Sequence, residues 1–208
     1  LFINMTASKN ALIIFTRNPE LGKVKTRLAA TIGNQSALEI YKLLIHHTVR
    51  ITSTINANKY VFYSENIQKN DAWNPSIFKK ELQNGKNLGE RMQNAFDLLF
   101  KKGYQKIVIV GSDIYELNSE DIEDSFITLK TSSYVIGPAK DGGYYLLGMT
   151  QLNKNIFEKK NWGTDTVFND TILDLKENVV VLLSEKNDID IYDDIKNMEV
   201  FNQFLIKK

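Results

Sequence analysis

Short apolar runs alternate along the chain with segments in which apolar residues recur every three or four positions. The runs at residues 11–15 and 106–111 are rich in Ile and Val and end at Gly- or Pro-containing loops, which predicts buried strands. Residues 88–102 have apolar side chains three and four positions apart, which predicts an amphipathic helix. The same reasoning predicts strands at 59–64, 76–82, 134–137, 144–149 and 179–183, and helices at 36–55, 119–130, 165–178 and 192–207.

This alternation of strands and helices is typical of a mainly parallel, twisted sheet covered on both faces, a three-layer α/β/α fold. The pattern breaks at residues 131–163, where two strand-like segments flank a Gly-rich stretch, so we expect substrate-specific structure there. A length of 208 residues fits one domain with some elaboration. We therefore expect an N-terminal extension at residues 1–10 and a single domain over residues 11–208.

The amino-acid composition argues against several classes of function. The 26 Lys and Arg against 25 Asp and Glu leave a net charge of +1, which argues against a general nucleic-acid or membrane-surface binder. The absence of Cys excludes thiolate chemistry and disulfides. No apolar run is long enough for a bilayer, and the first ten residues lack the pattern of a signal peptide. These features fit a cytoplasmic enzyme.

The segment after the first predicted strand is strongly basic. Arg17, Lys23, Lys25 and Arg27 surround Gly22 just before a helix start, an arrangement suited to phosphate oxygens. The segment has neither the Walker pattern nor the dinucleotide Gly-x-Gly-x-x-Gly pattern. A solvated basic loop is the alternative explanation of the same residues.

Acidic residues follow two other predicted strands. Asp113 comes directly after the strand at 106–111, where ligands of open α/β sheets bind and a hard cation can bridge a carboxylate to phosphates. Asp188 and Asp190 share a face if the chain is extended there, and one or both would complete a metal site. Capping at Asp113, and an acidic first turn of the last helix, explain the same residues without a ligand.

A third segment combines an acid with two glycines. Asp141, Gly142 and Gly143 permit a sharp turn and a close approach to a ligand, although a hairpin turn needs the same residues. Trp162 and the small polar residues after it precede a predicted helix, for which capping by Thr164 is the alternative role.

In this order, the segments resemble the GT-A-type nucleotide-diphospho-sugar transferase superfamily. More closely, the chain resembles the glycosyltransferase-like family associated with radical-SAM or selenium-related gene sets, which is similar to 2-phospho-L-lactate guanylyltransferase and the molybdenum-cofactor nucleotidyltransferases. The resemblance covers about residues 10–205. The matching segments are FTRNP (15–19), GKVKTRL (22–28), LGERM (88–92), GSD (111–113), GPAKDGGY (137–144), WGTDT (162–166), DID (188–190) and DD (193–194).

The resemblance implies a Rossmann-like GT-A fold and a role for each matching residue. The implied phosphate- and nucleotide-binding residues are Arg17, Gly22, Lys23, Lys25, Thr26, Arg27 and Arg91. The implied substrate loop contains Asp141, Gly142, Gly143, Tyr144, Trp162 and Asp165. The implied ligands of Mg²⁺ or Mn²⁺ are Asp113, Asp190 and Asp188, and the implied catalytic residues are Asp113, Asp141, Lys25 and Arg27. Arg17 replaces the family's usual Lys and keeps its charge, whereas Tyr115 replaces a common Pro and loosens the turn after Asp113.

The implied activity is a divalent-metal-dependent transfer of a sugar from a nucleotide-sugar donor to a small-molecule acceptor. The alternative is transfer of a nucleoside monophosphate from a triphosphate to a phosphorylated acceptor. A non-catalytic nucleotide-binding module is a third reading, against which the retained acidic residues count. We expect neither nucleic acid nor a membrane as a partner. The sequence is compatible with a homodimer but does not specify the oligomeric state.

Overall fold

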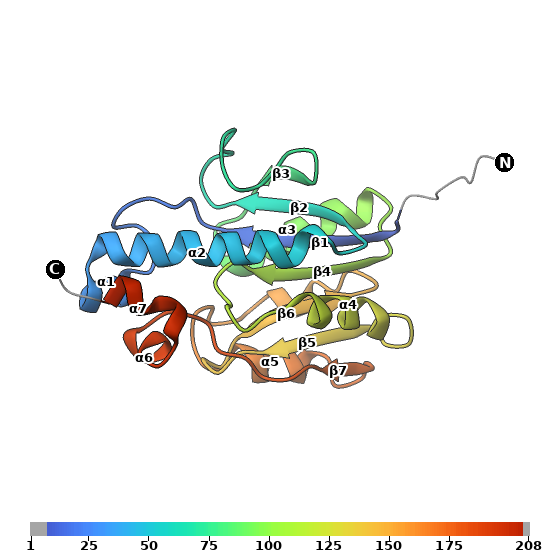
Figure 1. Ribbon diagram of the computed structural model, residues 1–208. Coiled ribbons are helices and arrows are strands. Elements are labelled where there is room, and N and C mark those ends of the chain that lie inside the picture. Colours follow the sequence, from blue (N-terminus) through green and yellow to red (C-terminus); the bar gives the residue numbers. More distant parts are fainter. Residues whose placement is uncertain (1–7, 206–208) are drawn as a thin grey trace.

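The computed structural model describes residues 8–205 and is organised around one seven-stranded sheet (Figure 1). The strand order is β3-β2-β1-β4-β6-β5-β7, and only β6 runs antiparallel to its neighbours. This confirms the prediction of a mainly parallel sheet. The strands are β1 (Asn10–Thr16), β2 (Asn58–Tyr63), β3 (Phe78–Leu82), β4 (Lys106–Gly111), β5 (Tyr134–Pro138), β6 (Tyr144–Met149) and β7 (Val180–Leu182).

Helices cover both faces of the sheet, because alternate side chains of the central strands enter two different cores. Leu12 and Ile14 of β1 belong to the core under α2 and α4, whereas Ala11 and Ile13 belong to the core under α3. The three-layer prediction is therefore confirmed. The helices are α1 (Thr26–Ile32), α2 (Asn34–Ser53), α3 (Leu88–Lys101), α4 (Ser119–Thr128), α5 (Val167–Asp174), α6 (Tyr192–Ile195) and α7 (Asn202–Leu205), with 3₁₀ turns η1 (Asn155–Phe157) and η2 (Glu199–Phe201).

The prediction of one long final helix at 192–207 is wrong within the described residues. The segment is divided into α6, η2 and α7, and Met198 between them has an extended backbone. Ile195 and Phe201 are both fully buried in a third core, with Leu28 of α1 and Leu44 of α2. The broken path brings both side chains into that core. Residues 206–208 lie outside the described part of the chain.

Other helix boundaries also differ from the prediction by a few residues. The helix expected at 165–178 extends only over α5. The helix expected at 119–130 begins at Ser119, as predicted, but ends at Thr128; its N-cap is Asn118, which forms a capping box with Asp121.

The break in alternation at 131–163 corresponds to the β5–β6 hairpin and η1. Asp141, Gly142 and Gly143 lie in the turn that joins the two strands, so the hairpin explanation of these residues is confirmed. The N-terminal extension expected at 1–10 falls mostly on residues 1–7, which are not described, and the domain division stays a prediction. Within residues 8–205, no helix is long and apolar enough to cross a membrane.

We expect Gly148→Ala to destabilise the fold, because β6 lies between two neighbouring strands at this position. A Cβ atom on Gly148 would lie 2.6 Å from Val135 Cγ1 and 3.1 Å from Val108 Cγ2. The free energy of unfolding, measured with urea, should fall by about 1–3 kcal/mol. The control is Gly103→Asn, where nothing lies within 4 Å of the added Cβ, so that its loss comes only from the left-handed backbone (φ 89°), which Asn adopts more readily than most residues, and should be smaller. Equal losses in the two variants would contradict this account.

Candidate active site

A cleft of about 820 Å³ lies at the carboxyl ends of β1 and β4. This is the edge at which ligands of open α/β sheets bind, and the volume is within the usual range for ligand pockets. The residues that line it are Phe15, Thr16, Arg17, Asn18, Lys23, Val24, Lys25, Thr26, Arg27, Tyr41, Ser64, Glu65, Gln83, Asn87, Leu88, Arg91, Gly111, Ser112, Asp113 and Asp190. The cleft thus contains most of the predicted phosphate-binding residues and two of the three predicted metal ligands.

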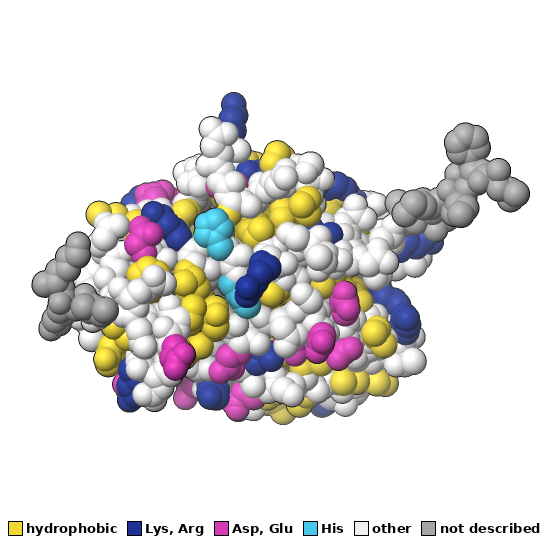
Figure 2. Space-filling model, in the orientation of Figure 1, with side chains coloured by type: hydrophobic (Ala, Val, Ile, Leu, Met, Phe, Trp, Pro, Cys, Tyr) yellow, Lys and Arg dark blue, Asp and Glu magenta, His cyan; other side chains and the backbone are white. Residues whose placement is uncertain are grey.

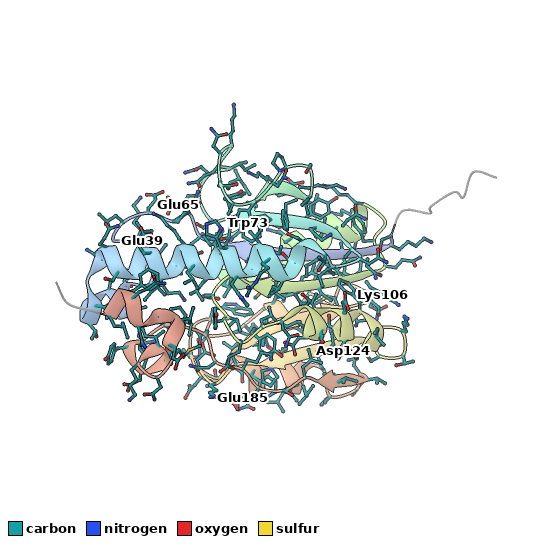
Figure 3. The ribbon with its side chains drawn as sticks, in the orientation of Figure 1. Glu39, Glu65, Trp73, Lys106, Asp124 and Glu185 are labelled. Carbon is teal, nitrogen blue, oxygen red and sulfur yellow. The ribbon has the colours of Figure 1, made fainter. Side chains whose placement is uncertain are left out.

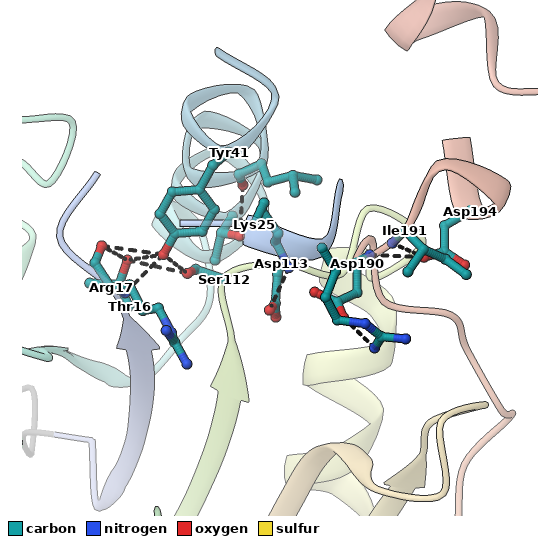
Figure 4. A network of polar contacts seen from close by, with 12 residues as sticks. Thr16, Arg17, Lys25, Tyr41, Ser112, Asp113, Asp190, Ile191 and Asp194 are labelled. Atoms are coloured by element: carbon teal, nitrogen blue, oxygen red, sulfur yellow. Dashed lines mark hydrogen bonds and ion pairs between the residues drawn. The ribbon is translucent and has the colours of Figure 1, made fainter. Parts of the chain in front are cut away.

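Lys25 and Asp113 form an ion pair inside this cleft (Figure 4), with 3.0 Å between Lys25 Nζ and Asp113 Oδ2. Lys25 has a left-handed backbone (φ 48°) directly before α1, and its side chain is only 6% exposed. Burial alone would lower the pKa of Lys25 and raise that of Asp113. Their mutual attraction outweighs burial, so the pKa of Lys25 is raised, the pKa of Asp113 is lowered, and both groups are charged at neutral pH.

A second ion pair lies closer to the solvent. Arg27 Nη1 is 2.7 Å from Asp190 Oδ2, and the Arg27 side chain is 71% exposed. The backbone N–H groups of Asp190 and Ile191 both donate to Asp194 Oδ2, at 2.8 and 2.7 Å. Asp194 therefore fixes the loop that carries Asp190.

The two acidic segments are joined through their backbones. Ile189 is buried in the third core, and its N–H donates to the carbonyl oxygen of Asp113 at 3.1 Å. Asp188 lies beside this junction, where burial and the charges of Asp113 and Asp141 raise the pKa of Asp188 to about 6. The structure thus brings all three predicted metal ligands to one region, although Asp188 does not line the cleft.

The carboxylates of this region fit Mg²⁺ or Mn²⁺ only if a bound ligand supplies further oxygen atoms to the metal. Carboxylate oxygens are the ligands that such hard cations prefer. Within residues 8–205, however, no group of three or more Asp, Glu, His or Cys residues is placed to hold a metal ion. Mg²⁺ is commonly bound by one or two carboxylates together with substrate phosphates. Asp113 and Asp190 fit that second kind of site.

Tyr41 of α2 connects the two loops that carry the charged residues (Figure 4). Its hydroxyl accepts a hydrogen bond from the Arg17 N–H at 2.8 Å and lies 3.1 Å from Ser112 Oγ and 3.3 Å from Thr16 Oγ1. Sequence reasoning missed Tyr41 as a site residue, because its position in the apolar periodicity of α2 only predicts burial.

Arg91 and Gln83 also line the cleft. Arg91 Nε donates to the carbonyl oxygen of Gly85 at 3.1 Å. Gln83 Nε2 donates to the carbonyl oxygens of Thr16 and Phe62, at 3.2 and 3.0 Å. Arg91 was predicted from the sequence, whereas no sequence pattern singled out Gln83.

The predicted substrate loop is assembled beside the cleft rather than in it. A Cβ on Gly142 (φ 86°) would lie 2.3 Å from the carbonyl oxygen of Asp165, so the turn packs directly on that residue. The rings of Tyr144 and Trp162 are 6.5 Å apart, and a Cβ on Gly89 would lie 2.4 Å from Trp162 Nε1. The sequence-predicted residues that do not line the cleft are Gly22, Asp141, Gly142, Gly143, Tyr144, Trp162, Asp165 and Asp188.

A second hollow, of about 200 Å³, is lined by α2 and the segment after β2, and shares Thr16 and Arg17 with the cleft. The hollow is lined in part by His46 of α2, and the two histidines (cyan) are visible on this face in Figure 2. Trp73, labelled in Figure 3, is buried at the hollow. This volume is below the usual range for ligand pockets, so the larger cleft is the candidate nucleotide site.

The fold is similar to those of solved transferase structures. The chain is similar to the "putative nucleotide-diphospho-sugar transferase" of Desulfovibrio desulfuricans G20, with a TM-score of 0.83 and 28% identity over 94% of this chain and 91% of that one. It shares its fold with 4-diphosphocytidyl-2C-methyl-D-erythritolsynthase from Anaerococcus prevotii DSM 20548 (TM-score 0.59, 10% identity, 95% and 97% covered). The same fold is found in CMP:2-keto-3-deoxy-manno-octonic acid synthetase complexed with CTP (TM-score 0.55, 8% identity, 93% of this chain and 98% of that one covered).

These likenesses define a transferase of the GT-A-like nucleotide-diphospho-sugar transferase superfamily, as the sequence resemblance implied. The family model described as uncharacterized protein conserved in bacteria (DUF2064) matches residues 48–164, more than half of the chain, and the chain belongs to that family. No curated protein matches the chain.

We expect Tyr41→Phe to destabilise the protein, because it removes the acceptor of the Arg17 N–H and a partner of Ser112. The free energy of unfolding in urea should fall by about 1–3 kcal/mol, the cost of leaving a partly buried polar group unpaired. The control is Tyr192→Phe on α6, whose side chain is exposed, where we expect a change within about 0.5 kcal/mol. A similar small change in both variants would show that the Tyr41 hydroxyl does not hold the two loops together.

Proposed function

We propose that the protein is a divalent-metal-dependent transferase that moves a sugar from a nucleotide-diphospho-sugar to a small-molecule acceptor. One observation carries this proposal: the cations after β1 and the carboxylates Asp113 and Asp190 occupy a single cleft at the carboxyl edge of the sheet. Cations that bind phosphates and carboxylates that bind a metal are the two charge sets that such a donor requires.

Arg17, Lys23, Lys25 and Arg27 bind the donor's phosphates in this proposal, with Gly22 and Thr26 in the same segment and Arg91 elsewhere in the lining of the cleft. Fixed cations in the cleft stabilise the negative charge that develops as the nucleotide leaves. Asp113 and Asp190, with Asp188 beside them, hold the cation, Mg²⁺ or Mn²⁺. When bound, the metal supplies further neutralisation of the departing phosphate.

The loop beside the cleft serves the acceptor in this proposal. Asp141 Oδ1 accepts a hydrogen bond from the Gly143 N–H at 2.8 Å, which fixes the carboxylate while its side chain stays exposed. Asp141 orients the acceptor hydroxyl, and Gly142 and Gly143 allow the backbone to approach it closely. Tyr144 and Trp162 supply an aromatic wall, and Asp165 supports the turn.

Nucleotidyl transfer is the second candidate, and the charge of the cleft favours it. Five cationic side chains line the cleft, against three acidic ones from Glu65, Asp113 and Asp190. A nucleoside triphosphate carries more negative charge than a nucleotide-diphospho-sugar and would use that excess. The synthetase complexed with CTP has the same fold.

A thermal-shift panel distinguishes the two reactions. Nucleoside triphosphates and nucleotide-diphospho-sugars are each added with and without Mn²⁺. A ligand at about a hundred times its dissociation constant should stabilise the protein by roughly 2.7 kcal/mol. We expect metal-dependent stabilisation by a nucleotide-diphospho-sugar. Stabilisation by triphosphates alone would favour nucleotidyl transfer, and no response to either class would contradict the nucleotide site.

We expect Asp113→Asn to lower turnover by about 10²-fold or more while nucleotide binding persists, because the carboxylate holds the metal that acts on the departing phosphate. Turnover is measured with the donor that the panel identifies. The control is Asp193→Asn, which changes an exposed aspartate paired with Lys196 on α6 and should leave turnover unchanged. Unchanged turnover in Asp113→Asn would contradict the metal role and favour a module that only binds nucleotide.

A further inference from the structure

The carboxylates assigned to the metal are paired with the cations assigned to the phosphates. Lys25 Nζ lies 3.0 Å from Asp113 Oδ2, and Arg27 Nη1 lies 2.7 Å from Asp190 Oδ2 (Figure 4). Each of the four side chains therefore already has an opposite charge beside it. A ligand that takes one member of a pair leaves the other member without its partner.

A divalent cation that binds by itself takes Asp113 away from Lys25. The Lys25 ammonium is almost fully buried, so it would lose its partner where water compensates poorly. The cation would also gain few ligands, because no group of three metal-binding side chains is placed together within residues 8–205. Binding of the metal alone is therefore disfavoured both by the loss of the partner of Lys25 and by the small number of protein ligands.

Phosphates that bind by themselves meet the opposite difficulty. They take Lys25 and Arg27, and Asp113 and Asp190 are then left beside further negative charge. If metal and phosphates enter together, the phosphates take the two cations and the metal takes the two carboxylates. Every charge then exchanges one opposite partner for another.

We propose that the Lys25–Asp113 and Arg27–Asp190 ion pairs are exchanged on binding, so that a divalent cation and a nucleoside diphosphate each bind tightly only in the presence of the other. This inference rests on the proposed function. The backbone contacts of the site support it. The Ile189 N–H is anchored to the Asp113 carbonyl, and Asp194 anchors the backbone of Asp190. The carboxylates can therefore change partners by side-chain rotation alone.

Lys23 provides a matched control within the same loop. It is exposed and lines the same cleft, but its ammonium pairs with Glu20 at 2.6 Å and lies 3.9 Å from Glu65. Neither carboxylate is an assigned metal ligand. Lys23→Gln and Arg27→Gln thus remove the same charge from the same basic segment, and only Arg27→Gln releases a carboxylate assigned to the metal.

The first measurement is the affinity for Mn²⁺ alone, read from the electron paramagnetic resonance signal of free Mn²⁺. We expect weak binding by the wild type and by Lys23→Gln. Arg27→Gln should bind Mn²⁺ several-fold more tightly, a modest gain because the pair is largely exposed. Lys25→Met should gain more, provided that circular dichroism shows it to be folded; Arg27→Gln decides the test if it is not. Equal Mn²⁺ affinity in Arg27→Gln and Lys23→Gln would overturn the exchange.

The second measurement repeats the titration with ADP, GDP, CDP or UDP present. We expect about a tenfold or greater gain in Mn²⁺ affinity for the wild type, and by reciprocity the same gain in nucleotide affinity when Mn²⁺ is present. The gain should be smaller in Arg27→Gln than in Lys23→Gln, because loss of the Lys23 charge weakens nucleotide binding with and without Mn²⁺ and releases no carboxylate assigned to the metal. Because Mn²⁺ also binds nucleotides in solution, the comparison is between variants under identical conditions.

The outcomes separate this inference from the proposed function. Nucleotide binding with no dependence on Mn²⁺ in any variant would overturn the exchange and leave the nucleotide site in place. Absence of binding by all four diphosphates, with or without Mn²⁺, would contradict the proposed function and the mutual dependence. The Mn²⁺-only comparison of Arg27→Gln with Lys23→Gln would still decide whether Arg27 competes with the metal for Asp190.

Discussion

The site depends on the parallel pairing of β1 with β4. Their register places Phe15 opposite Gly111, so the chain leaves both strands at the same level of the sheet. The basic loop therefore begins directly beside Ser112 and Asp113, and Lys25 reaches Asp113 across a separation of 88 residues. Any shift of this register would move the two charge sets apart along the strands. The apolar residues of β1 and β4, buried on both faces, keep the register fixed.

The charges that suit the cleft to ligands also contribute to its structure. A nearly buried ammonium such as that of Lys25 is tolerated because it has a carboxylate partner. The loop is fixed further by neutral groups, since the Tyr41 hydroxyl contacts residues from both loops. The loops are thus held by uncharged contacts, while the charges are held in pairs that, in our proposal, change partners on binding. Such an arrangement keeps the empty cleft stable and leaves its electrostatics free to respond to a ligand.

Local patterns were enough to predict most of the fold. The apolar spacing of residues 88–102 predicted α3 to within one residue, because that helix buries one face along its whole length. The same reasoning failed after residue 192, where Ile195 and Phe201 are at a spacing compatible with one helix but enter the core from a broken chain. Spacing records which side chains are buried. It does not record the path by which the backbone brings them there.

Most charged residues of the candidate site could be predicted from the sequence, but their contacts with one another could not. Lys25, Arg27, Asp113 and Asp190 stood out because they follow apolar strands, where ligands of open α/β sheets bind, and the family resemblance implied their roles. Nothing in the sequence indicated that they would pair with one another, since 88 and 163 residues separate the partners. Polar residues such as Gln83 contribute through bonds to backbone carbonyls, which are specified by the fold rather than by neighbouring residues.

Charge balance links the site to its two candidate reactions. The four exchanging side chains sum to zero, and a nucleotide-diphospho-sugar with two negative charges and one divalent cation also sums to zero. Its binding would therefore leave the cleft neutral at these positions without help from other residues. A nucleoside triphosphate brings about two further negative charges, for which Arg17 and Arg91 are the available cations, since neither takes part in an ion pair within residues 8–205. The paired charges alone thus balance the charge of a nucleotide-diphospho-sugar, for which Arg17 and Arg91 are additional phosphate contacts, whereas a nucleoside triphosphate also needs the charge of the two arginines. The demand on the charges of Arg17 and Arg91 is therefore the physical difference between the two reactions in this cleft.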